Sequence, residues 1–203
     1  MLSESFQATL KILLFRGGPA DFPYSEQPGL SRACMLLGSL AMAAVLGQML
    51  PLGMALASGA VATAGVSMFV RTLLRLRGLE ARYAQTRNAM LAAGSVLLLL
   101  ISLPIATIMP SITAFMASLP APAAGAEPLT ISADQIPNLP RGASLLVDLL
   151  MIWFLAVTGH VLRQAANLGY LGSGLLTLLC VLNVMLLVAF SGPLLALLFG
   201  GAA

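Results

Sequence analysis

An uncharged stretch of 38 consecutive residues, 33–70, constrains this chain more than any other feature, because it contains no Asp, Glu, Lys, Arg or His. Such a run is typical of a membrane-spanning segment, but it is too long for one crossing. As one helix it would extend roughly 57 Å, whereas the hydrocarbon core of a bilayer is about 30 Å thick. Within it, Pro51 removes a backbone donor and Gly53 permits a turn. The stretch therefore predicts a helical hairpin with spans at 33–50 and 54–72.

Composition places the whole chain in the membrane. Only 8% of its 203 residues are charged, against about 25% in a soluble domain, and the mean hydropathy is +0.98. The net charge of +3 does not indicate nucleic-acid binding, because the basic residues sit in short segments that flank apolar runs. Nine of the ten basic residues are Arg, and the chain is rich in Ala, Leu and Gly, which favours a GC-rich bacterial source.

Three further apolar runs predict spans at 89–109, 144–165 and 173–192. Pro104 is expected to kink the third span and Pro110 to close it. A proline-rich outer loop, 118–143, follows that span. The fold class is therefore an all-α integral membrane protein with five transmembrane helices, in which residues 31–203 form a single transmembrane domain.

The first 30 residues are expected to form a cytoplasmic region of two parts. Residues 2–16 place Leu2, Phe6, Leu10, Leu13 and Leu14 on one helical face, which predicts an amphipathic interfacial helix; a frayed soluble tail is the alternative. A Gly/Pro/aromatic elbow follows, because two glycines and two prolines prevent a continuous helix. Its candidate contacts with a partner or with lipid are Asp21, Phe22 and Tyr24; a rigid structural elbow is the alternative.

Charge then predicts how the chain is threaded. With five spans, nine of the ten basic residues fall on one side of the membrane, and Arg141 alone falls on the other. By the positive-inside rule the N-terminus is cytoplasmic and the C-terminus periplasmic in a bacterial inner membrane.

Small residues at four-residue spacing mark the helix contacts within the hairpin. In lipid, helices associate through close van der Waals packing, so such rows predict contact faces. One row lies on each arm of the hairpin, and the two rows are expected to face each other. They comprise Ser39, Ala43 and Gly47 on the first arm and Ala55, Gly59, Thr63 and Ser67 on the second.

The basic segment 71–87 is expected to continue the second arm beyond the membrane, with Gly78 as a possible break. Arg71, Arg75 and Arg82 share one helical face and are candidate contacts for anionic lipid headgroups. An orientation signal without any dedicated ligand is the alternative interpretation.

A candidate intramembrane polar site consists of Asp148, His160, Arg163 and Asn167, because ionisable groups within spans are costly. Structural hydrogen bonding is the alternative for His160. The two cysteines have no paired spacing and are expected to pack as small apolar residues. No common hydrolase, metalloprotease or nucleotide-binding motif occurs, so no catalytic residue, metal or cofactor is predicted.

The layout resembles the Yip1-type families of five-span membrane proteins, with Pro19–Tyr24 as the Pro/aromatic stretch before the first span and a short outer tail ending at Ala203. The resemblance implies a role in membrane organisation and carries over no site residue. Our leading hypothesis is a non-catalytic accessory or scaffold subunit that binds other integral membrane proteins, as a hetero-oligomer or homo-oligomer. A small transporter or channel component is the alternative. An intramembrane enzyme using Ser173 or Cys180 ranks third.

Overall fold

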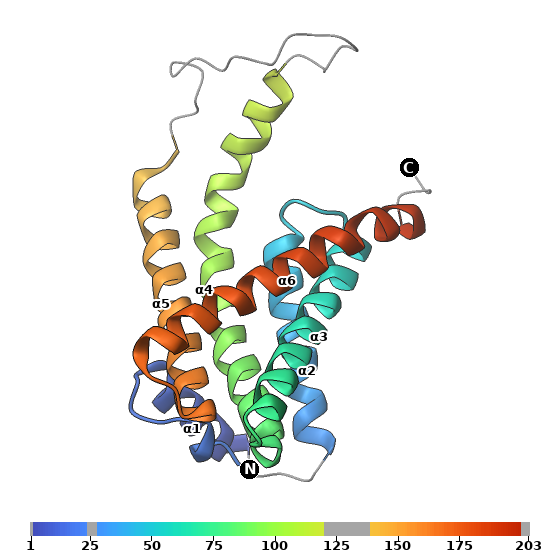
Figure 1. Cartoon of the computed structure of the whole chain (residues 1–203). Coiled ribbons are helices and arrows are strands. Elements are labelled where there is room, and N and C mark those ends of the chain that lie inside the picture. The colour runs from blue at the N-terminus through green and yellow to red at the C-terminus, as the bar shows by residue number, and fades with distance from the viewer. Residues whose placement is uncertain (1, 24–27, 120–138, 200–203) are drawn as a thin grey trace.

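The computed structural model describes residues 2–23, 28–119 and 139–199, and every regular element in these ranges is helical (Figure 1). Five helices, α2 to α6, are long and apolar enough to cross a membrane, which confirms the predicted fold class. Tyr24 and most of the loop 118–143 lie outside the described residues. The elements are α1 (Leu2–Leu13), η1 (Pro19–Asp21), α2 (Pro28–Leu46), α3 (Leu52–Leu76), η2 (Glu80–Arg82), α4 (Tyr83–Ser118), α5 (Arg141–Ala166) and α6 (Tyr170–Phe199).

The hairpin forms as expected, from α2 and α3 joined by a turn over residues 47–51. Its two rows of small residues face each other. A Cβ atom added at Gly59 would overlap the Ser39 carbonyl oxygen and lie 3.0 Å from the Ala43 nitrogen, so only glycine allows this approach. α3 continues to Leu76, and Gly78 follows with a φ of +67°, which confirms the predicted break.

Two helices continue through prolines, one of which, Pro110, was expected to close a span. α4 continues through Pro104 and Pro110 to Ser118, and α6 continues through Pro193 to Phe199. The expectation that Pro110 closes the third span is therefore wrong. Each proline removes one backbone hydrogen bond, and near Pro110 the Thr113 hydroxyl donates to the Met109 carbonyl at 3.0 Å, so a side chain satisfies a backbone acceptor there.

The large buried side chains gather around α4. α4 contacts α1, α2, α3 and α5, and the hydrophobic core combines α4 residues such as Leu97 with Ile12, Phe22, Leu74 and Leu162. The rows of Gly, Ala and Ser bring α2 and α3 close together but bury little side-chain volume. The hairpin is therefore a close-packed pair that also contributes Val70 and Leu74 to this core.

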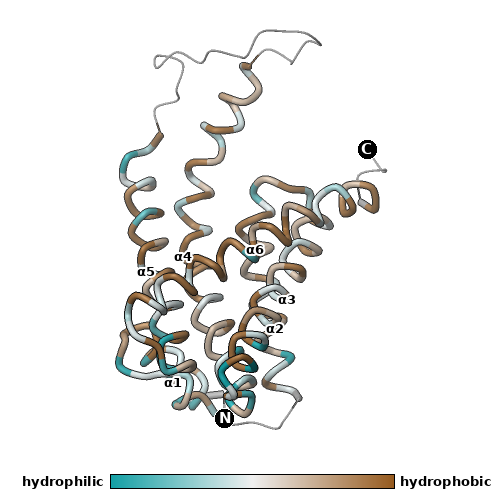
Figure 2. The backbone as a smooth tube through the Cα atoms, viewed as in Figure 1, coloured by the Kyte–Doolittle hydropathy of each residue, from teal (hydrophilic) through white to brown (hydrophobic). Residues whose placement is uncertain are grey.

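Polar residues are concentrated at one end of the bundle, which we call the basic end (Figure 2). α1, the last turns of α3 and α5, and the start of α4 meet there, and the C-terminal end of α6 lies away from it (Figure 1). Bonds between distant segments join this end: Ser31 donates to Asn88 at 3.4 Å, and Arg82 donates to Asn167 at 3.4 Å. Arg141 begins α5 at the opposite end.

Candidate functional site

The N-terminal helix packs on the bundle through one face and leaves another face exposed. Ile12 is fully buried and Leu13 is 7% exposed, whereas Phe6 is 64% exposed. Leu13 was expected on the same face as Phe6, and it instead turns inward. The exposed face, with Leu10, remains apolar, so α1 presents one surface to the protein and one that suits the membrane interface.

A docked elbow, residues 14–22, follows α1 and lies against α4 and α5. The elbow begins with a left-handed residue, Phe15, whose φ is +58°. Trp153 of α5 donates its indole N–H to the Leu13 carbonyl at 3.0 Å, and Gln85 donates to the Phe22 carbonyl at 3.1 Å. Side chains from two spans thus satisfy backbone groups that the elbow would otherwise leave unpaired in a buried place.

Two candidate contacts in this elbow have structural roles. Phe22 is 1% exposed and packs in the core, so it does not present its ring to a partner, and the rigid-elbow alternative describes it better. Asp21 accepts a hydrogen bond from the Gly18 backbone N–H at 2.7 Å, which closes a short turn, while its side chain remains exposed.

His160 connects α5 to the elbow. Its Nε2 lies 2.9 Å from the Gly17 carbonyl oxygen, a bond that the tautomer protonated at Nε2 makes by donating. The Gln164 side-chain amide lies 2.9 Å from the same nitrogen and occupies the space that a side chain on Gly18 would need. The Phe15 ring meets the imidazole edge-on at 5.3 Å. His160 therefore has the structural hydrogen bond that was the alternative to a titrating or ligand role.

Arg82 completes the end of α5. Its guanidinium donates to the Ala165 carbonyl and to the Asn167 side-chain oxygen, both at 3.4 Å. Asn167 ends the helix in a left-handed conformation with a φ of +52°, which Asn tolerates better than most residues. Both bonds come from one terminal nitrogen, and the Arg82 side chain otherwise remains exposed.

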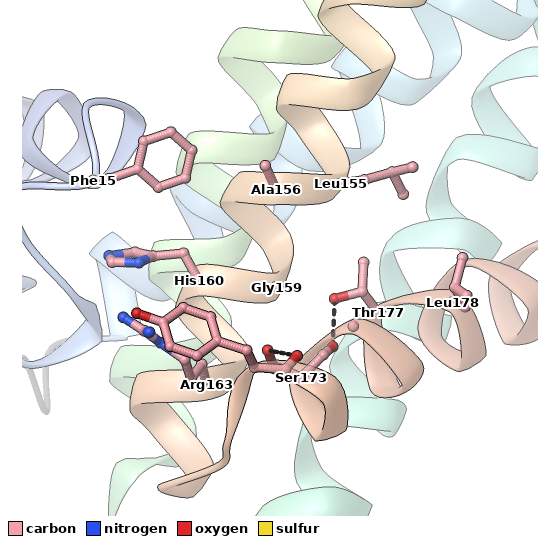
Figure 3. A pocket seen from close by; sticks show the side chains of 11 residues that line it. Phe15, Leu155, Ala156, Gly159, His160, Arg163, Ser173, Thr177 and Leu178 are labelled. Atoms are coloured by element: carbon pink, nitrogen blue, oxygen red, sulfur yellow. Dashed lines mark hydrogen bonds between the residues drawn. The ribbon is translucent and has the colours of Figure 1, made fainter.

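An open groove of about 650 Å³ lies between α5 and α6, next to the docked elbow (Figure 3). Arg163 makes one end of the groove cationic. Its guanidinium stacks 4.2 Å from the centroid of the Tyr170 ring. The lining residues are Phe15, Leu155, Ala156, Gly159, His160, Arg163, Tyr170, Ser173, Gly174, Thr177 and Leu178.

The four residues predicted as one polar site are divided by the structure. His160 and Arg163 line the groove, whereas Asn167 faces Arg82. Asp148 lies about 18 Å along α5 from His160, by the rise per residue, and its side chain is exposed. The groove therefore contains half of the predicted set.

The remaining lipid-contact candidates are exposed at the basic end. Arg71 lies on the surface of α3, and Arg75 pairs with Glu80 at 3.5 Å, with both side chains largely exposed. An exposed pair like this contributes little to stability. The position of both arginines is compatible with headgroup contact.

The sequence interpretation missed the α6 side of the groove. Ser173 and Thr177 are one turn apart and both buried, and Thr177 lies 3.1 Å from the Cβ position of Gly159 on α5. Their hydroxyls donate to backbone carbonyls of α6 itself, at 2.9 and 2.8 Å (Figure 3). The i, i+4 spacing of small polar residues was a usable signal, because it marks a helix-contact face in membranes.

These features define a class of protein: an all-helical, multi-pass membrane protein with an N-terminal helix docked on the basic end of its bundle. Over the ranges that the structure describes, no cluster of His, Cys, Asp and Glu has the composition of a metal site. Comparison with protein-family models, curated proteins and solved structures finds no match to this chain.

Proposed function

We propose that the chain is a non-catalytic accessory or scaffold subunit that assembles with other integral membrane proteins in a bacterial inner membrane. The resemblance in topology to the Yip1-type families agrees with such a role and stays a prediction. The proposal rests on how unevenly the bundle buries its apolar surface.

The main support for this proposal is the exposure of α5 in its N-terminal half, the half that begins at Arg141. Viewed down the helix axis, its exposed side chains cover an arc from Met151 through Leu149 to Leu146. At about 100° per residue this arc is more than half of the helix circumference. α2 and α6 also leave most of their spans unburied, and an apolar surface of this kind in a membrane faces either lipid or a further helix. Since membrane helices associate by close packing, a surface this wide favours contact with a further helix.

Charge supports the orientation of the proposed subunit. The basic end carries Arg16, Arg32, Arg163 and the arginines of 71–87, whereas Arg141 stands alone at the other end. By the positive-inside rule the basic end faces the cytoplasm, so the docked elbow is cytoplasmic and the C-terminus periplasmic. Anionic headgroups would meet the exposed arginines at this face.

Photo-crosslinking in cells combined with purification in mild detergent tests the proposal. A photoreactive residue at Leu149, which is 62% exposed, should form an adduct with a second protein or a second copy. The same residue at the neighbouring Leu150, 7% exposed, should form none and serves as the matched control. A monomer that purifies at native expression without a partner, and without a Leu149 adduct, would refute the assembly role.

A small transporter or channel component is the second candidate, favoured by the groove that His160 and Arg163 line. In this function the polar end of the groove would receive a solute from the cytoplasmic side. Flux into liposomes should then fall in His160→Ala and Arg163→Ala. Flux that neither substitution changes would count against transport.

A further inference from the structure

We propose that the groove between α5 and α6 binds one anionic phospholipid, with its phosphate at Arg163 and an acyl chain along Leu155 and Leu178. This site is separate from the arginines of 71–87, and it does not depend on the proposed assembly role. Four observations carry it: the free donors of Arg163, the depth of that residue, the amphipathic lining, and the open space at Gly174.

Arg163 has hydrogen-bonding capacity to offer a ligand. Its guanidinium is held in place by stacking on Tyr170, and no oxygen in the described part of the chain accepts a hydrogen bond from it. The last carbonyls of α5 do not need it, because Arg82 already donates to Ala165. A guanidinium presents five N–H donors in a fixed planar arrangement that matches a phosphate. An arginine whose position is fixed and whose donors have no acceptor is therefore well suited to bind a phosphate.

The depth of Arg163 matches a lipid headgroup. It lies in the last turn of α5, at the basic end, where the chain leaves the apolar part of the span. Leu155 lies eight residues earlier on the same helix, which places it roughly 12 Å deeper by the rise per residue. The groove therefore has its charge at the interface and its apolar wall toward the membrane interior, the same order as in a phospholipid.

The lining favours an amphiphile over a free anion. The apolar wall of Leu155, Ala156 and Leu178 would give an inorganic phosphate no favourable contact. The volume of about 650 Å³ lies in the range of sites for ligands with substantial apolar surface. The polar groups between the two ends do not compete for the phosphate, since His160 is bonded to Gly17 and Thr177 to Ser173.

Gly174 gives the groove its room. No atom lies within 4 Å of the position that its Cβ would occupy, although the residue lines the groove on α6. A side chain can therefore begin at this position of the groove lining without an overlap at its Cβ. This makes Gly174 a means of filling the site while leaving the Arg163 charge in place.

Lipid binding by the full-length purified protein tests the proposal. The protein would be equilibrated in detergent with vesicles of phosphatidylglycerol or phosphatidylcholine, and bound lipid counted by native mass spectrometry. One phosphatidylglycerol should bind per chain in preference to phosphatidylcholine. Arg163→Gln should weaken this binding about tenfold or more, as expected for lost charge-assisted hydrogen bonds, and Arg163→Lys should restore part of it.

The matched control is Arg141→Gln, which removes an exposed arginine at the opposite end of α5 and should leave the bound lipid unchanged. Gly174→Leu should reduce binding with the charge intact, and it decides the question if Arg163→Gln fails to fold. Equal binding by Arg163→Gln and Arg141→Gln would overturn the proposal. So would unchanged binding by Gly174→Leu, or full displacement of phosphatidylglycerol by millimolar inorganic phosphate.

Discussion

Replacing Gly59 with alanine tests the close contact between α2 and α3. The added methyl would lie 3.0 Å from the Ala43 nitrogen and 3.2 Å from its Cβ, and it would overlap the Ser39 carbonyl oxygen. These neighbours are mainly backbone, so no side-chain rotation relieves the overlap. Reaching ordinary contact at about 3.5–4.0 Å with the Ser39 oxygen requires the two helices to separate locally by roughly 1 Å or more.

The size of the effect follows from two opposing terms. Overpacking costs about 1–3 kcal/mol, and the rigid backbone neighbours place Gly59→Ala at the upper end. Alanine returns about 1 kcal/mol through its higher helix propensity, which leaves a net loss of about 2 kcal/mol. The free energy of unfolding in mixed SDS micelles, followed by circular dichroism, measures this loss.

The control for this experiment is Gly94→Ala in α4, where the new methyl would meet Phe154 at an ordinary 3.6 Å. It should be neutral or stabilise the protein by up to about 1 kcal/mol, because the same propensity gain meets no overlap. The difference between the two variants isolates the packing term. If Gly59→Ala were as stable as Gly94→Ala, the small residues would not set the distance between the helices.

Three further predictions concern the basic end and the threading. Trp153→Phe should loosen α1 and its elbow, because it removes the donor to a buried carbonyl; proteolysis near the N-terminus should become several times faster. Asn167→Gly should be tolerated, because glycine readily adopts the left-handed conformation of this residue. Asn167→Ala should lower the free energy of unfolding by about 1–2 kcal/mol, because alanine disfavours that conformation and the bond from Arg82 is lost. Single cysteines placed at Glu80 and at Arg141, with the native cysteines replaced by serine, test the threading. The cysteine at 141 should react with an impermeant maleimide in intact spheroplasts, whereas the cysteine at 80 should react only after lysis. Labelling of both from the same side would refute the threading.

The membrane-spanning helices could be predicted because their determinants are local. Apolar length and the absence of charge over 33–70 decide that the segment spans, and Pro51 decides that it spans twice. The four-residue spacing of small residues also predicted the face that Gly59 presents to Ser39. Each of these signals acts within a single helix or between adjacent ones.

The docked elbow could not be predicted, because its contacts join segments far apart in the chain. Trp153 and Leu13 are 140 positions apart, and His160 and Gly17 are 143 apart. A sequence shows that such side chains have hydrogen-bonding capacity, but it does not show which backbone group will use it. For the same reason His160 and Asn167, which are seven residues apart on α5, were grouped together although they bond to different segments.

The helix ends were misjudged for a different physical reason. Pro110 and Pro193 carry the signals that end helices in water, where exposed carbonyls are solvated. In a membrane protein, neighbouring helices and Ser/Thr side chains satisfy the backbone groups that a proline frees, so the helix continues. Proline therefore predicts a helix end only when the surrounding solvent is known.

The position of the core explains why the two ends of this bundle differ. At the basic end, α1 and its elbow contribute large buried side chains such as Ile12 and Phe22, which belong to the same core cluster as Leu74 and Leu162. No corresponding segment covers the other end among the residues that the structure describes, and the outer side chains of α5 remain exposed there. Since lipid gives apolar surfaces no hydrophobic reason to pack, only shape-matched contact would bring a helix to that surface. The basic end is thus closed by the chain itself, and assembly with a further subunit is expected at the opposite half of α5.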